Sequence, residues 1–201
     1  MSITNGYCTL ADLRAHLGYA TADSVDDVLL EQAINDASRF IDRYTERRFF
    51  TTSADETRYV TANDFYELRG LDIVSLTTLA TDSDGDRVYE TTWAATDYDL
   101  TPYNAALDGE PYTGICIPLT GRYTFPWTSR GVKLIGKFGY AAIVPASIKS
   151  ACLLLAAYGF KLKDNPLGIS GAAGVGQIIV DLKIAKLVQQ KLDQYSRARL
   201  L

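Results

Sequence analysis

The chain has 201 residues, of which 47% are hydrophobic and 22% are charged, so it can bury a core and is not expected to be disordered. Its net charge of −4 argues against an electrostatic nucleic-acid binder, which needs a basic face. Three cysteines, an odd number with no two close in sequence, indicate a reducing compartment, and the single histidine leaves few ligands for structural zinc. The N-terminus has neither a basic nor an apolar stretch typical of a signal peptide, so a cytoplasmic protein is expected.

Two amphipathic helices are predicted near the start of the chain. Thr9 occupies the position of an N-cap, Asp12 completes a capping box, and Gly18 marks the end of the first helix. A second helix is expected to begin at Ser24. Its apolar residues recur at spacings of four and three, which predicts one buried stripe formed by Leu30, Ile34, Ala37, Ile41 and Tyr44.

From Thr57 onward the pattern changes to that of short strands. Segments rich in β-branched and aromatic residues alternate with turn signals containing Gly, Asn and Asp. The predicted strands are 57–60, 65–68, 73–81, 88–92, 98–101, 114–119 and 132–140. This spacing favours a small antiparallel sandwich or a barrel-like domain.

Helical periodicity returns after Pro145, which suits the first turn of a helix. This helix is expected to be the most buried, with Cys152 as a plain core residue. A glycine-rich loop over residues 164–176 follows, and Asp181 is predicted to cap a final helix. The final helix and its tail are basic. A solvent-exposed helix face is a more common explanation of such a run than a site that contacts phosphate, and we favour it here. The basic residues are Lys183, Lys186, Lys191, Arg197 and Arg199.

These elements predict an α+β fold with an insertion. Amphipathic helices from both chain ends bury their stripes against one another, so residues 1–50 and 141–201 should form one small helical bundle. Residues 51–140 would then be an inserted β domain. The chain should leave and rejoin the bundle at neighbouring points, near Phe50 and Tyr140.

Two loops resemble ligand-binding motifs only in part. Residues 82–86 (DSDGD) look like the start of a calcium loop, but Arg87 and Trp93 stand where an EF-hand needs glycine and glutamate. A hairpin turn is therefore favoured. The glycines of residues 171–176 are in the wrong order for a phosphate loop and do not follow a strand.

Candidate catalytic groups are scattered. His16 has no recognisable nucleophile partner and is expected on a partly exposed helix face. The acids Asp97, Asp99, Asp108 and Glu110 leave a hydrolase open as an alternative, although acids that form turns are commoner. We expect no enzyme activity and assign no catalytic, cofactor-binding or metal-binding residue.

Aromatic residues of the strand-rich region allow a second reading. Most should belong to the core, but the loop YTFPW could form a contact patch through Tyr123, Phe125 and Trp127. A binding module that recognises a glycan or a peptide through these rings is therefore the alternative function.

The order of the helical segments resembles a known family. TLADLRAHL over residues 9–17 is followed by a long helix over 26–49, and VPASIKSACLLLAAY comes much later, over 144–158. Residues 97–105 and 132–140 are similar to the β insert of larger members. The chain thus resembles the head–tail connector (adaptor) proteins of tailed phages and prophages, the gp6-like and gp15-like group.

The resemblance implies a structural protein of the virion neck, made in the host cytoplasm and acting without cofactor, metal or membrane. Copies would form a ring, expected to be twelve-fold, below the portal protein. The ring would join the DNA-filled head to the stopper or tail-completion protein, and DNA would pass through its channel without sequence-specific binding.

Two segments are expected to contact the portal or a neighbouring subunit. The glycine-rich loop and the C-terminal tail carry apolar residues although neither can build a core of its own. Their candidate contact residues are Pro166, Leu167, Ile169, Val175, Ile178, Ile179, Arg197, Arg199, Leu200 and Leu201.

Overall fold

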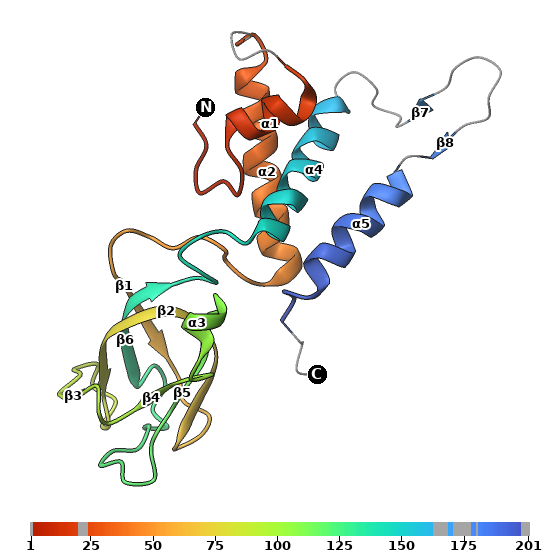
Figure 1. Cartoon of the computed structure of the whole chain (residues 1–201). Coiled ribbons are helices and arrows are strands. Elements are labelled where there is room, and N and C mark those ends of the chain that lie inside the picture. The colour runs from red at the N-terminus through yellow and green to blue at the C-terminus, as the bar shows by residue number, and fades with distance from the viewer. Residues whose placement is uncertain (1, 20–23, 163–168, 171–177, 180, 198–201) are drawn as a thin grey trace. The chain divides into compact units, whose positions relative to one another are not determined.

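The computed structural model describes residues 2–19, 24–162, 169–170, 178–179 and 181–197. The chain divides into two compact units: a helical unit, Met1–Phe49 with Val144–Leu201, and a β unit, Phe50–Ile143 (Figure 1). The predicted insertion, residues 51–140, lies within the β unit. Among the described residues, no helix combines the length and the apolar character needed to cross a bilayer.

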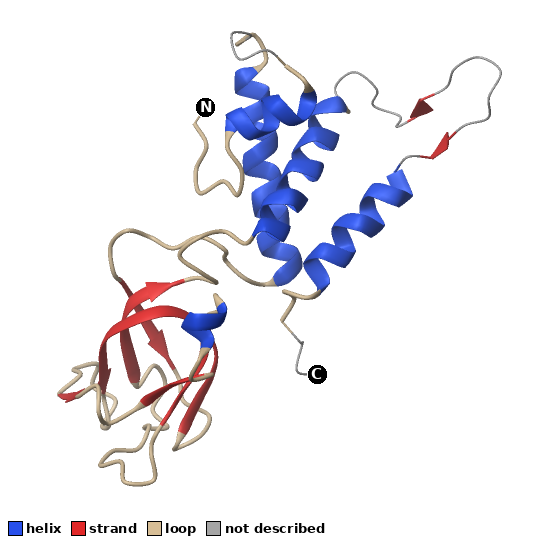
Figure 2. Ribbon diagram, in the orientation of Figure 1, coloured by secondary structure: helices blue, strands red, loops and turns tan. Residues whose placement is uncertain are grey.

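The helical unit is built around α4. Its helices are α1 (Leu10–Leu17), α2 (Asp27–Thr45), α4 (Ala146–Lys161) and α5 (Asp181–Asp193). α4 contacts the other three helices, and two short strands, β7 (Ile169–Ser170) and β8 (Ile178–Ile179), pair between α4 and α5 in the sequence (Figure 2). The buried apolar residues include Leu13, Leu30, Ile34, Ile41, Ile148, Ala151, Cys152, Ala156, Phe160, Val188 and Leu192.

The caps predicted for α1 are confirmed. The backbone N–H of Asp12 donates to Thr9 Oγ1, and the backbone N–H of Thr9 donates to Asp12 Oδ2, each over 3.1 Å. Gly18 ends the helix in the left-handed region, with φ of 77°. The Asp12 carboxylate also lies 2.9 Å from Lys149 Nζ, so one side chain both caps α1 and joins it to α4.

Asp12 makes the stability of the helical unit depend on pH. The Lys149 ammonium, followed by the Thr9 donors, lowers the pKa of Asp12 from 3.8 to about 2. Because the folded pKa lies below the unfolded one, this contribution is fully present above pH ~4 and is lost as the pH falls through ~2. We expect Asp12→Asn to lower the free energy of unfolding by about 1 kcal/mol or less near neutral pH, since the carboxylate is partly exposed and solvent screens its ion pair.

Chemical denaturation of wild type and Asp12→Asn at several pH values measures this contribution. The difference between the two proteins should shrink as the pH falls from ~4 toward ~2. Glu90→Gln, at an exposed acid of the β unit, is the control and should leave the stability profile of the wild type unchanged. A difference at Asp12 that stays constant with pH would contradict the ion pair with Lys149.

The N-terminal segment, residues 2–9, is tied to α2 by polar contacts. The backbone N–H of Thr4 donates to Asn35 Oδ1, and that of Tyr7 donates to Ser38 Oγ, over 2.9 and 3.1 Å. The buried Tyr7 hydroxyl donates to Asp42 and accepts from the Phe49 N–H. A chain segment without regular structure is thereby held against the helices.

The β unit contains one six-stranded antiparallel sheet. Its order is β1-β6-β2-β5-β4, with β3 paired to β2 beside this path. The elements are β1 (Glu56–Val60), β2 (Glu67–Thr81), β3 (Thr91–Trp93), β4 (Asp99–Thr101), α3 (Ala105–Asp108), β5 (Tyr112–Cys116) and β6 (Val132–Phe138).

The predicted barrel-like closure is wrong, because β1 and β4 end the sheet and do not pair with each other. The predicted strands 65–68 and 73–81 are one strand, β2. β2 continues through Gly70, which adopts a φ of 77°, and its register with β5 shifts between Arg69 and Ile73. Its first half pairs with β5 and its second half with β3 and β6, so one bent strand serves both halves of an open sheet.

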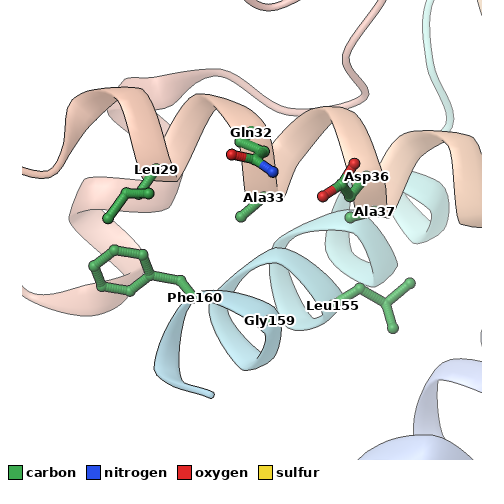
Figure 3. Close-up of a pocket in the computed structure, with 8 residues that line it drawn as sticks. All are labelled: Leu29, Gln32, Ala33, Asp36, Ala37, Leu155, Gly159 and Phe160. Carbon is green, nitrogen blue, oxygen red and sulfur yellow. The ribbon is translucent and has the colours of Figure 1, made fainter. Parts of the chain in front are cut away.

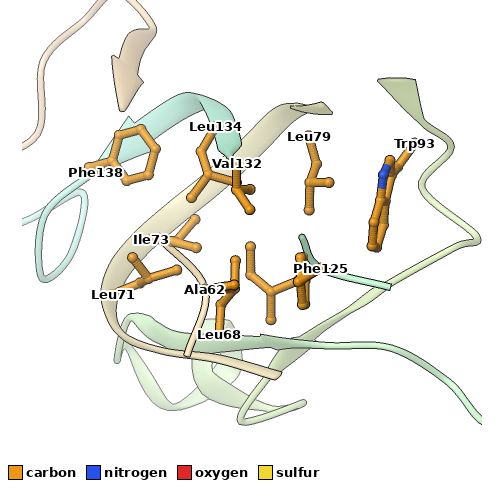
Figure 4. Packing of buried hydrophobic residues seen from close by; sticks show 11 residues of the cluster. Ala62, Leu68, Leu71, Ile73, Leu79, Trp93, Phe125, Val132, Leu134 and Phe138 are labelled. Carbon is orange, nitrogen blue, oxygen red and sulfur yellow. The ribbon is translucent and has the colours of Figure 1, made fainter. Parts of the chain in front are cut away.

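The core of the β unit gathers on the concave side of this bent sheet (Figure 4). The Trp93 and Phe125 rings stack with centroids 5.0 Å apart, and Trp93 Nε1 donates to Thr81 Oγ1 over 3.1 Å. The other members of the cluster are Ala62, Leu68, Leu71, Ile73, Leu79, Ile115, Val132, Leu134 and Phe138.

Candidate docking surface on the helical unit

Helix α2 is apolar on two sides. One side carries the predicted core stripe, of which Leu30, Ile34, Ala37 and Ile41 are buried. Outside this stripe, on the exposed surface called here the outer face of α2, Val28, Leu29 and Phe40 are exposed by 57%, 46% and 46%. Large apolar side chains that recur on one exposed helix face indicate a contact surface, whereas scattered ones need no explanation. The remaining exposed residues of this face are Gln32, Asp36 and Arg43.

A groove of about 250 Å³ runs between the outer face of α2 and α4. Figure 3 shows Leu29, Gln32 and Asp36 on the α2 side, opposite Leu155, Gly159 and Phe160 of α4. A Cβ added at Gly159 would meet no atom within 4 Å, so the glycine leaves the groove open. The groove therefore has mostly apolar walls, with Gln32 and Asp36 as its polar lining residues, and room for a side chain from another molecule.

The groove beside α2 and the exposed side of α5 carry opposite charges. Asp36 is the charged residue among those that line the groove. Helix α5 buries Val188 and Leu192, and it exposes Lys186, Leu187 and Gln190 on its other side, called here the outer face of α5. Leu187 is 46% exposed beside the lysine. The groove beside α2 thus combines apolar residues with an acid, and the outer face of α5 combines an apolar residue with a base.

Most of the predicted portal-contacting residues lie outside the described part of the chain. These are Pro166, Leu167, Val175, Arg199, Leu200 and Leu201. Ile169, Ile178 and Ile179 lie in the paired strands β7 and β8. The backbone N–H of Arg197 donates to the Thr45 carbonyl over 3.2 Å, so the chain after α5 starts beside the C-terminal end of α2.

The three predicted aromatic contact residues of the β unit have different surroundings. Phe125 is fully buried in the core and so cannot contribute to a surface of the folded unit. Tyr123 is half-buried and stacks on Trp93 with centroids 5.2 Å apart. Trp127 is 64% exposed and stacks on Phe65, itself 48% exposed, over 5.0 Å. The exposed aromatic pair is therefore Phe65–Trp127, and sequence reasoning missed Phe65.

The acidic turn after β2 is held by its own backbone. Carboxylate oxygens of Asp82, Asp84 and Asp86 lie within 4.8 Å of one another. Asp82 accepts hydrogen bonds from the N–H groups of Gly85 and Arg87, over 2.7 and 2.9 Å. These bonds account for the buried carboxylate as part of a turn.

The acids weighed for hydrolysis do not share a cavity. Glu110 lines a depression of about 290 Å³ with seven neighbours, none of which is acidic. Asp97 instead accepts from the Ala94 N–H within a turn, over 2.8 Å. Asp99 and Asp108 belong to β4 and α3, and His16 is exposed on α1. The structure brings together no pair of these groups for acid–base work.

The chain resembles known proteins in its three-dimensional structure but matches none by sequence family. No protein family and no curated protein matches the sequence. A chain in "Neck of empty GTA particle computed with C6 symmetry" is similar to this one, with 19% identity and a TM-score of 0.59. A chain in "Virion of native gene transfer agent (GTA) particle" shows 20% identity and the same TM-score. Each match covers 100% of this chain and 95% of the other, so the likeness in fold includes both units.

Proposed function

We propose that this protein is a structural adaptor in the neck of a phage-like particle, and that it joins the head to the tail without catalysing a reaction. The observation that carries the proposal is the fold likeness over the whole chain to a component of a gene transfer agent neck. The exposed apolar face of α2 supports it, because a building block must present such a face to a neighbour.

The proposed neighbour is a second copy of the chain. The outer face of α2 in one copy would pack against the outer face of α5 in the next, with Leu187 entering the groove beside Leu29 and Lys186 facing Asp36. Such an interface joins two different surfaces, and a repeated contact of this kind forms a ring when the rotation between neighbouring copies closes. A twelve-fold ring is proposed, a multiple of the six-fold symmetry named for the similar neck.

The portal protein and the stopper or tail-completion protein are the proposed partners above and below this ring. Residues 166–179 and 196–201 are the proposed contacts with the portal or a neighbouring subunit. The acidic chain would let DNA pass through the channel without sequence-specific binding. Assembly in the host cytoplasm is part of the same proposal.

Deleting the gene from the genome that encodes the particle tests the adaptor role. We expect DNA-filled heads without attached tails, counted by electron microscopy, and a loss of infectious or gene-transferring particles. A plasmid copy of the intact gene should restore both. Normal tailed particles from the deletion strain would contradict the proposed function.

The ring interface is tested by placing a charge on the outer face of α2. Leu29→Asp is expected to weaken self-association at least tenfold, measured by mass photometry and by ring counts in electron micrographs of protein mixed with portal. Leu107→Asp, at a leucine of α3 that is 87% exposed, is the matched control and should assemble normally.

A charge reversal distinguishes failure of the proposed interface between copies from failure of the proposed adaptor role. Asp36→Lys should weaken rings, and Lys186→Asp in the same chain should restore them. If wild-type rings form on the portal and none of these changes affects them, the interface is wrong while the adaptor role stands. If neither wild type nor variants ever join the portal, the adaptor role fails.

The exposed pair Phe65–Trp127 supports the second candidate, a module that binds a glycan or a peptide. We expect Trp127→Ala to leave ring and particle assembly unchanged under the adaptor proposal, as judged by yields of tailed particles. Loss of adhesion to host-cell glycans with normal assembly would favour the second candidate.

A further inference from the structure

Two buried thiols of the helical unit lie in contact although 144 positions separate them in the sequence. Cys8 belongs to the N-terminal segment and Cys152 to α4, and their sulfur atoms are 3.4 Å apart. Their exposed fractions are 5% and 0%. The third cysteine, Cys116, lies in the β unit and is half-buried. A pair of sulfurs at this separation needs a shift of only about 1.4 Å to reach bonding distance.

The surroundings make the two thiols unequal. Hydrogen bonding from Cys8, with contacts to Ser38 and to the backbone of residues 7 and 8, lowers the pKa of Cys152 and outweighs burial, which raises it. Hydrogen bonding to Cys152, followed by burial, raises the pKa of Cys8. Ser38 Oγ is 3.5 Å from the Cys152 sulfur. Cys152 is therefore the thiol that ionises first, and the thiolate is the form that attacks a disulfide.

We propose that Cys8 and Cys152 are an oxidation site, at which a small-molecule disulfide such as oxidised glutathione converts the two thiols into a disulfide that fixes the N-terminal segment to α4. This inference is independent of the proposed neck function, since it rests on the pair of thiols alone.

The exchange balances in two steps. The Cys152 thiolate attacks one sulfur of oxidised glutathione, and one glutathione thiolate leaves, which gives a mixed disulfide on Cys152. Cys8 then loses its proton and attacks the Cys152 sulfur, and the second glutathione thiolate leaves. The protein gives up two electrons and two protons, and oxidised glutathione becomes two molecules of glutathione.

Access to the site requires the N-terminal segment to move, because both sulfurs are buried. Releasing residues 2–8 without unfolding α2 or α4 would require breaking the contacts of Ser2 and Thr4 with Asn35 and of Tyr7 with Ser38, Asp42 and Phe49. The bond from Arg39 to the Asn5 carbonyl would also have to break. The exchange should therefore be slow, and faster in any variant that loosens this segment. Once formed, the bond would prevent the same opening, because it ties the segment covalently to α4.

The test uses the full chain in a Cys116→Ser background, so that only the two thiols of interest remain. After incubation with oxidised glutathione we expect loss of both titratable thiols and an intact mass lower by that of two hydrogen atoms. The midpoint of thermal unfolding should rise, and dithiothreitol should reverse all three changes. Tyr7→Phe, which loosens the N-terminal segment, should form the bond faster.

The variants Cys8→Ser and Cys152→Ser in the same background are the controls. Each should acquire at most one glutathione, with no internal cross-link, and circular dichroism should verify that each remains folded. If the protein with both cysteines keeps two free thiols after prolonged oxidation, or retains glutathione as a mixed disulfide, the proposal is overturned.

Discussion

Replacing Phe125 with alanine is expected to lower the free energy of unfolding of the β unit by about 3–5 kcal/mol. The ring is fully buried and stacks on Trp93 with centroids 5.0 Å apart and an interplanar angle of 14°. Its removal leaves a cavity among side chains fixed by the sheet, and the Trp93 hydrogen bond to Thr81 limits collapse. Denaturant titration followed by tryptophan fluorescence measures the loss.

Trp127→Ala is the matched control, because Trp127 belongs to the same loop. It loses mainly a stacking contact with Phe65 at the surface, so the expected cost is about 1 kcal/mol or less. Equal destabilisation by the two changes would contradict the assignment of Phe125 to the core and Trp127 to the surface.

Gly136→Ala is expected to disrupt the pairing of β2 with β6. A Cβ at this position would lie 2.2 Å from the Ser75 carbonyl oxygen and 2.9 Å from Leu76 Cα, both backbone atoms. The β2–β6 register shifts on either side of these two residues, so the strands cannot separate there without losing ladder bonds. We expect the free energy of unfolding to fall by about 3 kcal/mol or more, the upper end of the usual range for overpacking, and the midpoint of thermal unfolding to fall with it.

Gly159→Ala provides the comparison for that change. A Cβ at Gly159 meets no atom within 4 Å, and alanine favours the helix. The free energy of unfolding of the monomeric variant should therefore be higher than that of the wild type by about 0.5–1 kcal/mol. A loss of stability in Gly159→Ala as large as that in Gly136→Ala would show that close backbone approach is not the reason for the glycine in β6.

Local signals were sufficient to predict the helices of the first third of the chain. The capping box of Thr9 and Asp12 and the left-handed Gly18 depend on residues within one turn of each other, so sequence spacing identifies them. The buried stripe of α2 follows from helical period alone, and four of its five predicted members are buried. The fifth, Tyr44, is half-buried, and its hydroxyl donates to Asp193 of α5.

The open sheet could not be predicted in the same way. Arg69 and Gly70 look like a break between two strands, but Gly70 lets β2 bend and continue. Whether strands close a barrel depends on pairing between distant residues, and alternation within each strand does not report it. The predicted number of strands was therefore too high by one, and the closure was wrong.

The candidate surface was present in the sequence as apolar residues of α2 outside its core stripe. Val28, Leu29 and Phe40 do not belong to that stripe, a signal that a single-stripe interpretation overlooks. The buried and exposed rings of the loop YTFPW could not be distinguished from the sequence. Side chains in an irregular loop do not alternate regularly between the core and solvent, so spacing does not predict which of them are buried. The contact of Cys8 with Cys152 depends on tertiary packing across the unit, which spacing does not encode.

The pairing of β1 with β6 has a consequence for how this architecture can change. Glu56 pairs with Gly136 and Val60 with Val132, so the first strand starts where the last one finishes. The Phe50 carbonyl oxygen would lie 2.3 Å from a Cβ at Gly139, which places the two connections next to each other. An inserted domain whose two ends lie close together can be deleted and replaced by a short loop, or inserted into a loop of another protein, in a single genetic event. Its size and surface could then diversify while the helices keep their sequence.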